Sequence, residues 1–75
     1  MYRMSLATIY VALLNEGTDV WKPVTAEHLH DDVFRVIGSM PEDEQWAFPP
    51  GSVVSAARKV FRDGSYGTVA VALVG

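Results

Sequence analysis

Four cations of this 75-residue sequence could contact phosphate groups if they line one edge of a sheet, as in small β-barrels that bind single strands. They are Arg35, Arg58, Lys59 and Arg62. The net charge of −3 and the isoelectric point of about 5.1 give no general attraction to phosphate. Interleaved aromatic rings would strengthen this reading, but Phe34 and Phe61 have the pattern of core residues. Nucleic acid is therefore not the expected partner, and phosphate binding by these cations is kept as an alternative.

The acidic run Glu42, Asp43 and Glu44 could dock on a basic protein or imitate phosphates. This suggests a second class of function, a small acidic inhibitor encoded by a phage or mobile element, such as an anti-CRISPR protein. A solvated turn is the simpler interpretation of the same residues.

Four aromatic residues could form a groove for extended or proline-rich peptides: Trp21, Trp46, Phe48 and Tyr66. Large aromatic side chains are mostly buried, and a domain of this length needs their area for its core. We therefore predict that Trp21, Trp46 and Phe48 lie in the core and that Tyr66, beside a turn, is exposed. Trp21 and Tyr66 stay candidates for partner binding.

No enzymatic or metal-binding constellation emerges from the remaining polar residues. His28 and His30 share one side of an extended strand with Asp32 nearby, but a convincing third ligand is missing. The serines show no nucleophile elbow, and no glycine-rich phosphate loop or paired carboxylates are present. We predict a protein without catalytic activity, metal or cofactor.

The chain that must position these residues reads as a single domain over residues 1–75, mostly β, with five strands and one short helical turn near residues 41–46. The predicted strands cover residues 6–14, 20–29, 33–37, 52–61 and 68–74. Asp63-Gly64 between apolar runs predicts a hairpin, and Pro23 indicates an edge position or a bulge. Trp46 and Phe48 should fold the long proline-rich loop back onto the core.

Residues 4–14 and 52–61 are also compatible with helices, so an α+β fold is the alternative. The apolar run from Leu6 to Leu14 is too short to cross a bilayer. We therefore expect no membrane association. Because the sequence contains no cysteine, we also expect a cytoplasmic protein without disulfides.

Two aromatic and proline motifs carry a resemblance to known sequences. The segments Glu16-Gly17-Thr18-Asp19-Val20-Trp21-Lys22-Pro23-Val24 and Glu44-Gln45-Trp46-Ala47-Phe48-Pro49-Pro50-Gly51-Ser52-Val53-Val54 resemble a group of short, uncharacterised bacterial proteins. The resemblance spans about residues 9 to 73, departs at Ser55-Ala56-Ala57, and implies a small SH3-like β-barrel. It implies no activity.

The predicted function is therefore protein interaction through an exposed strand edge, with the Pro23 strand or the terminal strand as the candidate edge. The partner would be another protein or a second copy of the chain.

Overall fold

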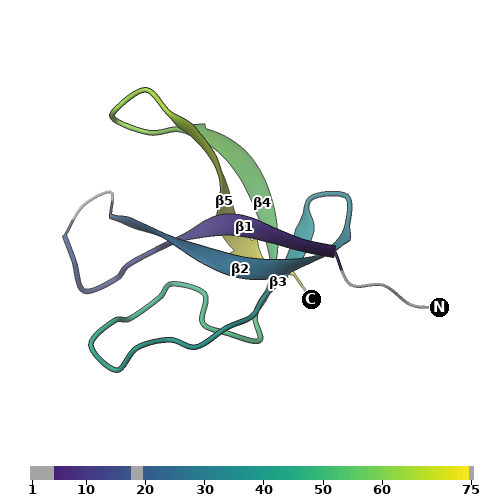
Figure 1. The fold of residues 1–75 in the computed structure, drawn as a ribbon, viewed down its shortest axis with the longest axis horizontal. Coiled ribbons are helices and arrows are strands. Elements are labelled where there is room, and N and C mark those ends of the chain that lie inside the picture. The colour runs from purple at the N-terminus through teal and green to yellow at the C-terminus, as the bar shows by residue number, and fades with distance from the viewer. Residues whose placement is uncertain (1–4, 18–19, 75) are drawn as a thin grey trace.

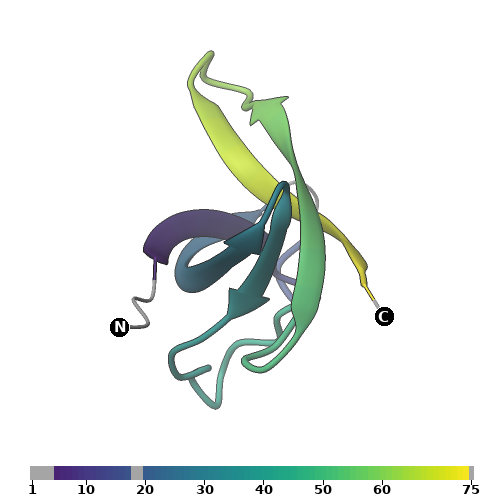
Figure 2. The ribbon, with the colours of Figure 1, turned by 90° about the vertical axis from the view of Figure 1, so that its right-hand side faces the viewer.

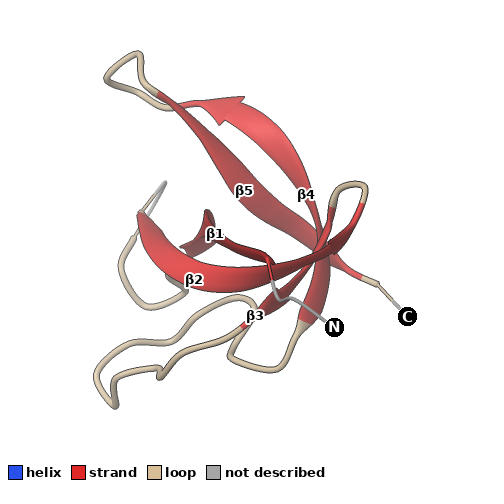
Figure 3. Cartoon of the chain, turned by 45° about the vertical axis from the view of Figure 1, so that its right-hand side comes forward, coloured by secondary structure: helices blue, strands red, loops and turns tan. Residues whose placement is uncertain are grey.

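The chain forms five strands that close into a small barrel, as the computed structural model shows (Figure 1, Figure 3). The structure describes residues 5–17 and 20–74. The strands are β1 (Ser5–Ala12), β2 (Trp21–His30), β3 (Val33–Val36), β4 (Val53–Val60) and β5 (Tyr66–Leu73). Each strand pairs antiparallel with the next, and β1 closes the barrel against β5 through one parallel pair, Tyr10 with Val69.

The predicted five-stranded, mostly β barrel is confirmed, and the α+β alternative is wrong because both doubtful segments are strands. The short helical turn expected near residues 41–46 is also absent as a helix. There the Glu44 N–H donates to the Pro41 carbonyl at 3.1 Å, which closes one turn and no more. None of the described residues forms a helix that could cross a membrane.

The core is built from alternate residues of the strands, because successive side chains of a strand point to opposite faces. Ile9 and Val11 of β1 are fully buried, as are Val36 and Val54. Val24, Ala26 and Ala70 complete the strand contribution to this cluster. One large ring from outside the strands completes the cluster.

That ring belongs to Trp46, in the loop between β3 and β4, which is hydrogen-bonded to the end of β1 and the residues after it. The Leu14 N–H donates to the Gln45 carbonyl at 2.7 Å, and the Ala47 N–H donates to the Ala12 carbonyl at 2.9 Å. Trp46 is 5% exposed within the core cluster, and Phe48 packs against that cluster. The prediction that this loop caps the core is confirmed.

The backbone of the β4–β5 hairpin extends beyond the other three strands (Figure 2). Its tip follows the Asp-Gly signal: Gly64 has φ of +90°, and the Phe61 N–H donates to the Ser65 carbonyl at 2.7 Å. Lys59 pairs with Gly67 and Val60 with Tyr66, beyond the contact of Val69 with β1. The strand pairing of the tip is therefore confined to β4 and β5.

Pro23 lies where its missing N–H costs little, in the half of β2 that pairs with β1 alone. The register between β2 and β3 covers only Ala26 to His30. Pro23 lies opposite Tyr10 of β1, on a half-strand that β3 does not cover. The expected edge position of this proline is thus confirmed.

Candidate functional site

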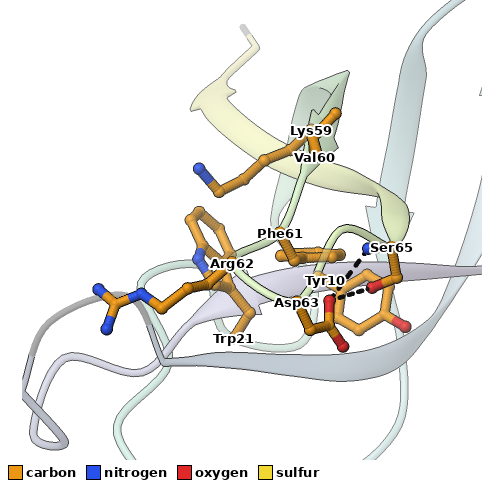
Figure 4. Close-up of a pocket in the computed structure, with 8 residues that line it drawn as sticks. All are labelled: Tyr10, Trp21, Lys59, Val60, Phe61, Arg62, Asp63 and Ser65. Atoms are coloured by element: carbon orange, nitrogen blue, oxygen red, sulfur yellow. Dashed lines mark hydrogen bonds between the residues drawn. The ribbon is translucent and has the colours of Figure 1, made fainter.

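A cleft of about 580 Å³ lies between the tip of the β4–β5 hairpin and the β1–β2 pair (Figure 4). The hairpin side of the cleft and the β1–β2 side come from opposite ends of the sequence. Its lining residues are Tyr10, Trp21, Lys59, Val60, Phe61, Arg62, Asp63 and Ser65. We call this site the hairpin cleft.

Tyr10 and Trp21 reach the hairpin cleft because they occupy the face of β1–β2 that points away from the core. Tyr10 lies between the buried residues Ile9 and Val11, so its side chain projects from the opposite face. Trp21 lies opposite Ala12, two residues further along the same face of β1. The barrel core and the cleft thus use the two faces of one strand pair.

Phe61 joins the two aromatic rings from the hairpin tip. Its ring centroid lies 4.9 Å from that of Tyr10 in an edge-to-face arrangement and 6.4 Å from that of Trp21. Gly67 makes this approach possible, since a Cβ at that position would lie 2.5 Å from Phe61 Cε2 and 2.8 Å from Tyr10 Cε1. The three rings form a second apolar cluster outside the barrel core.

Two cations of the hairpin lie against aromatic rings. Lys59 Nζ lies 5.6 Å from the Trp21 ring centroid, inside the hairpin cleft. Arg58, the preceding residue, has its guanidinium carbon 5.8 Å from the Tyr66 ring centroid. Because neighbouring residues of β4 point to opposite faces, the hairpin carries one cation–aromatic pair on each face.

The polar groups of the hairpin cleft differ in how well they are satisfied. Asp63 Oδ1 accepts the Ser65 N–H at 3.0 Å and the Ser65 hydroxyl at 2.7 Å. These two hydrogen bonds hold the pKa of Asp63 below its ordinary value, with the larger effect from the Ser65 hydroxyl and the smaller from the Ser65 N–H. By contrast, Trp21 Nε1 is buried without a hydrogen-bond acceptor. A buried indole N–H without a partner is uncommon and costs free energy.

The aromatic predictions are confirmed in part. Trp46 and Phe48 belong to the core and its lid, and Tyr66 is exposed. Trp21 was expected in the core but is half-buried in the hairpin cleft, and Phe61 is likewise half-buried there. Both predictions were wrong because Trp21 lies on the outer face of the β1–β2 pair and Phe61 follows β4 at the hairpin tip, so neither ring points into the barrel interior. Phe34 is partly buried against the core cluster.

The four candidate phosphate-binding cations do not lie together. Arg35 pairs across β2–β3 with Glu27, whose carboxylate is buried and lies 2.9 Å from Arg35 Nη1. Arg58, Lys59 and Arg62 lie on the hairpin, with Lys59 and Arg62 lining the cleft. The four cations therefore do not form the single row along one edge that the phosphate-binding alternative requires.

The acidic run is divided by the fold in a similar way. Glu44 turns inward, where one carboxylate oxygen accepts the Trp46 Nε1–H at 2.9 Å and the other accepts Lys22 Nζ at 3.0 Å. Glu42 and Asp43 remain exposed. Glu44 is thus part of the lid over the core, and the acidic surface is smaller than the sequence suggests.

Replacing Glu44 by glutamine should lower the urea midpoint of unfolding at pH 7, with a smaller difference at pH 3. Two hydrogen bonds lower the pKa of Glu44 from its ordinary 4.5, with the larger effect from Trp46 and the smaller from Lys22. A depressed folded-state pKa stabilises the fold above the unfolded-state pKa, and this contribution disappears as the pH falls through the folded value.

The exposed neighbour provides the control, because Glu42→Gln should leave the midpoint nearly unchanged at both pH values. If Glu44→Gln lowers the urea midpoint equally at pH 7 and pH 3, the charge of Glu44 contributes nothing to the stability of the fold.

The histidines are engaged in the turn between β2 and β3. His28 Nε2 donates to the Asp31 carbonyl at 2.6 Å, and the His28 ring packs on Phe34 with centroids 4.8 Å apart. His30 Nδ1 lies 3.3 Å from an Asp31 carboxylate oxygen. In the described part of the chain, no three histidine, cysteine or acidic side chains are grouped so that they could hold a metal ion.

Tyr10 and Gly67 were missed as site residues. Tyr10 carried a usable signal, since a large aromatic residue between two aliphatic core residues must project from the other face of its strand.

Comparison of the chain with protein-family models, curated proteins and solved structures finds no match.

Proposed function

We propose that this chain is a non-enzymatic protein-interaction module that pairs an extended segment of a partner with the free edge of β5. The observation that carries the proposal is the unequal pairing of this strand. β5 pairs with β4 from Tyr66 to Leu73 but with β1 only at Val69. An edge with unused N–H and carbonyl groups is a template for an added strand, as in β-strand augmentation.

The side chains along the same segment are apolar and exposed. Leu73 is 68% exposed, Val71 is 52% exposed and Val74 is 41% exposed. Val71 is the additional residue of a β-bulge, because Ser55 pairs with Ala72 and Ala56 with Ala70. Three neighbouring apolar side chains at an open edge support docking of a partner, since single exposed aliphatic residues are common but clusters mark interaction sites.

The expected partner is an extended segment of another protein, and antiparallel pairing of two β5 edges in a homodimer is the variant of the same mode. The absence of cysteine supports action in the reducing cytoplasm. The acidic-inhibitor alternative has less support, because Glu44 is occupied by Lys22 and Trp46 and leaves only Glu42 and Asp43 of its run for a basic partner.

A lysine at the β5 edge should weaken this interaction. Leu73→Lys places an ammonium where the added strand would be buried, so the affinity for the partner should fall about tenfold or more. Leu14→Lys is the matched control, because Leu14 is 60% exposed and lies outside β5. Capture from nuclease-treated host lysate, followed by titration of the recovered partner, compares the two variants.

The same pair of variants tests the homodimer by sedimentation, in which only Leu73→Lys should remove concentration-dependent association. Equal binding by both lysine variants would exclude the β5 edge. A photoreactive residue at position 73 should crosslink to the partner, while one at position 14 should not.

A further inference from the structure

The hairpin cleft is the strongest unassigned feature of the molecule, and it lies at the opposite end of β5 from the edge residue Leu73. Its chemistry is that of aromatic rings next to cations. Trp21 with Lys59 lies on one face of the hairpin and Tyr66 with Arg58 on the other. Two neighbouring β4 residues thus repeat the same cation–aromatic arrangement.

The charge distribution separates this hairpin from the rest of the described surface. Outside it, Lys22 lies 3.0 Å from Glu44 and Arg35 lies 2.9 Å from Glu27, so each of these cations faces a carboxylate. The carboxylate within the cleft, Asp63, has one oxygen turned to Ser65. Although the net charge of the chain is −3, cations are therefore concentrated locally around the hairpin tip.

The hairpin cleft is large enough to hold a ligand group. Its volume of about 580 Å³ falls within the range of ligand pockets, about 300–1,000 Å³. Trp21 and Phe61 are half-buried, so each contributes ring surface to the cleft as well as to their mutual contact. Figure 4 shows the Lys59 side chain extending above Trp21 and Arg62 reaching outward beside it.

We propose that the hairpin cleft binds single-stranded nucleic acid. One base stacks against the Trp21 and Phe61 rings while Lys59 contacts an adjoining phosphate, and Tyr66 with Arg58 receives the next part of the strand across the hairpin. Proteins that bind single strands combine these two elements, aromatic platforms for bases and cations for the backbone.

A nucleic acid fits this surface better than an acidic peptide does. A polymer that alternates planar rings with anions matches a hairpin that alternates aromatic rings with cations. An acidic peptide would use Lys59 and Arg58 but would leave the ring surfaces without a comparable partner. The peptide is therefore treated as a competing outcome of the experiment.

The test is a fluorescence anisotropy titration of labelled dT12 and rU12 at 50 mM salt. Phe61→Leu keeps the site apolar but removes the stacking ring, so binding should weaken about fivefold or more. Lys59→Gln should weaken it about tenfold. Lys22→Gln carries the same charge change outside the cleft and should bind almost as the wild type does. For two phosphate contacts, log K should fall with log salt at a slope of about −1.4.

A second measurement needs no variant. The chain has two tryptophans, and only the indole N–H resonance of Trp21 should shift when dT12 is added to labelled protein, since Trp46 is sealed in the core. The proposal would be overturned by any of three results. These are no binding of either oligonucleotide, no shift of either indole N–H resonance, or an equal loss of affinity in Lys22→Gln and Lys59→Gln. Equal displacement of dT12 by an oligoglutamate peptide would assign the cleft to acidic peptides instead. Leu73→Lys should bind dT12 normally, so failure here is distinct from failure of the β5 interaction.

Discussion

Trp46→Ala is expected to lower the free energy of unfolding by about 3–5 kcal/mol, the range for large aromatic residues removed from a core. Trp46 is 5% exposed, packs among the barrel residues and donates its Nε1–H to Glu44. At about 0.05–0.15 kcal/mol per residue, a chain of this length has roughly 4–11 kcal/mol of stability, so this single change removes much of it. Urea denaturation followed by circular dichroism measures the loss.

Two further variants separate the contributions of this side chain. Trp46→Phe retains most of the apolar bulk and removes the indole N–H, so its cost should fall between those of the wild type and Trp46→Ala. Leu14→Ala, at an exposed site near the same loop, should cost less than about 0.5 kcal/mol. If Trp46→Ala costs as little as Leu14→Ala, the loop between β3 and β4 does not close the core.

Gly67→Ala is expected to destabilise the protein by about 1–3 kcal/mol, the usual cost of an added methyl group in a packed site. The new Cβ would lie 2.5 Å from Phe61 Cε2 and 2.8 Å from both Phe61 Cζ and Tyr10 Cε1. Because these atoms belong to the two rings that pack together in the hairpin cleft, the alanine must push them apart. The change should also weaken the binding proposed for the cleft.

A double-mutant cycle with Phe61→Leu identifies the cause of the destabilisation. Leucine removes the ring atoms closest to the added methyl group, so Gly67→Ala should cost less in the Phe61→Leu background. Additive costs would mean that the methyl group acts elsewhere, for example on the backbone of β5. Urea unfolding of the four proteins provides the comparison.

Local signals indicated the strands and the loop that caps the core, although they left residues 4–14 and 52–61 open as helices. Alternating apolar residues and the Asp63-Gly64 turn depend on residues close in sequence, and they predicted the strands and the β4–β5 hairpin. The prolines around Trp46 and Phe48 similarly predicted a loop that folds back, because two large rings are too apolar to leave in water.

The sequence by itself therefore indicated five strands and the ring that closes the core. Only the tertiary structure decided that residues 4–14 and 52–61 contribute strands and not helices, and which side chains form the hairpin cleft. Strand alternation tells which residues share a face, but not what covers that face. The pair between Tyr10 and Val69 crosses most of the chain, and it places the hairpin tip near the outer face of β1–β2. Because of that long-range contact, Trp21 and Phe61 lie in the cleft and not in the core. Arg35 and Glu44 are engaged by residues distant in the sequence or in the loop, Arg35 by Glu27 and Glu44 by Trp46 and Lys22.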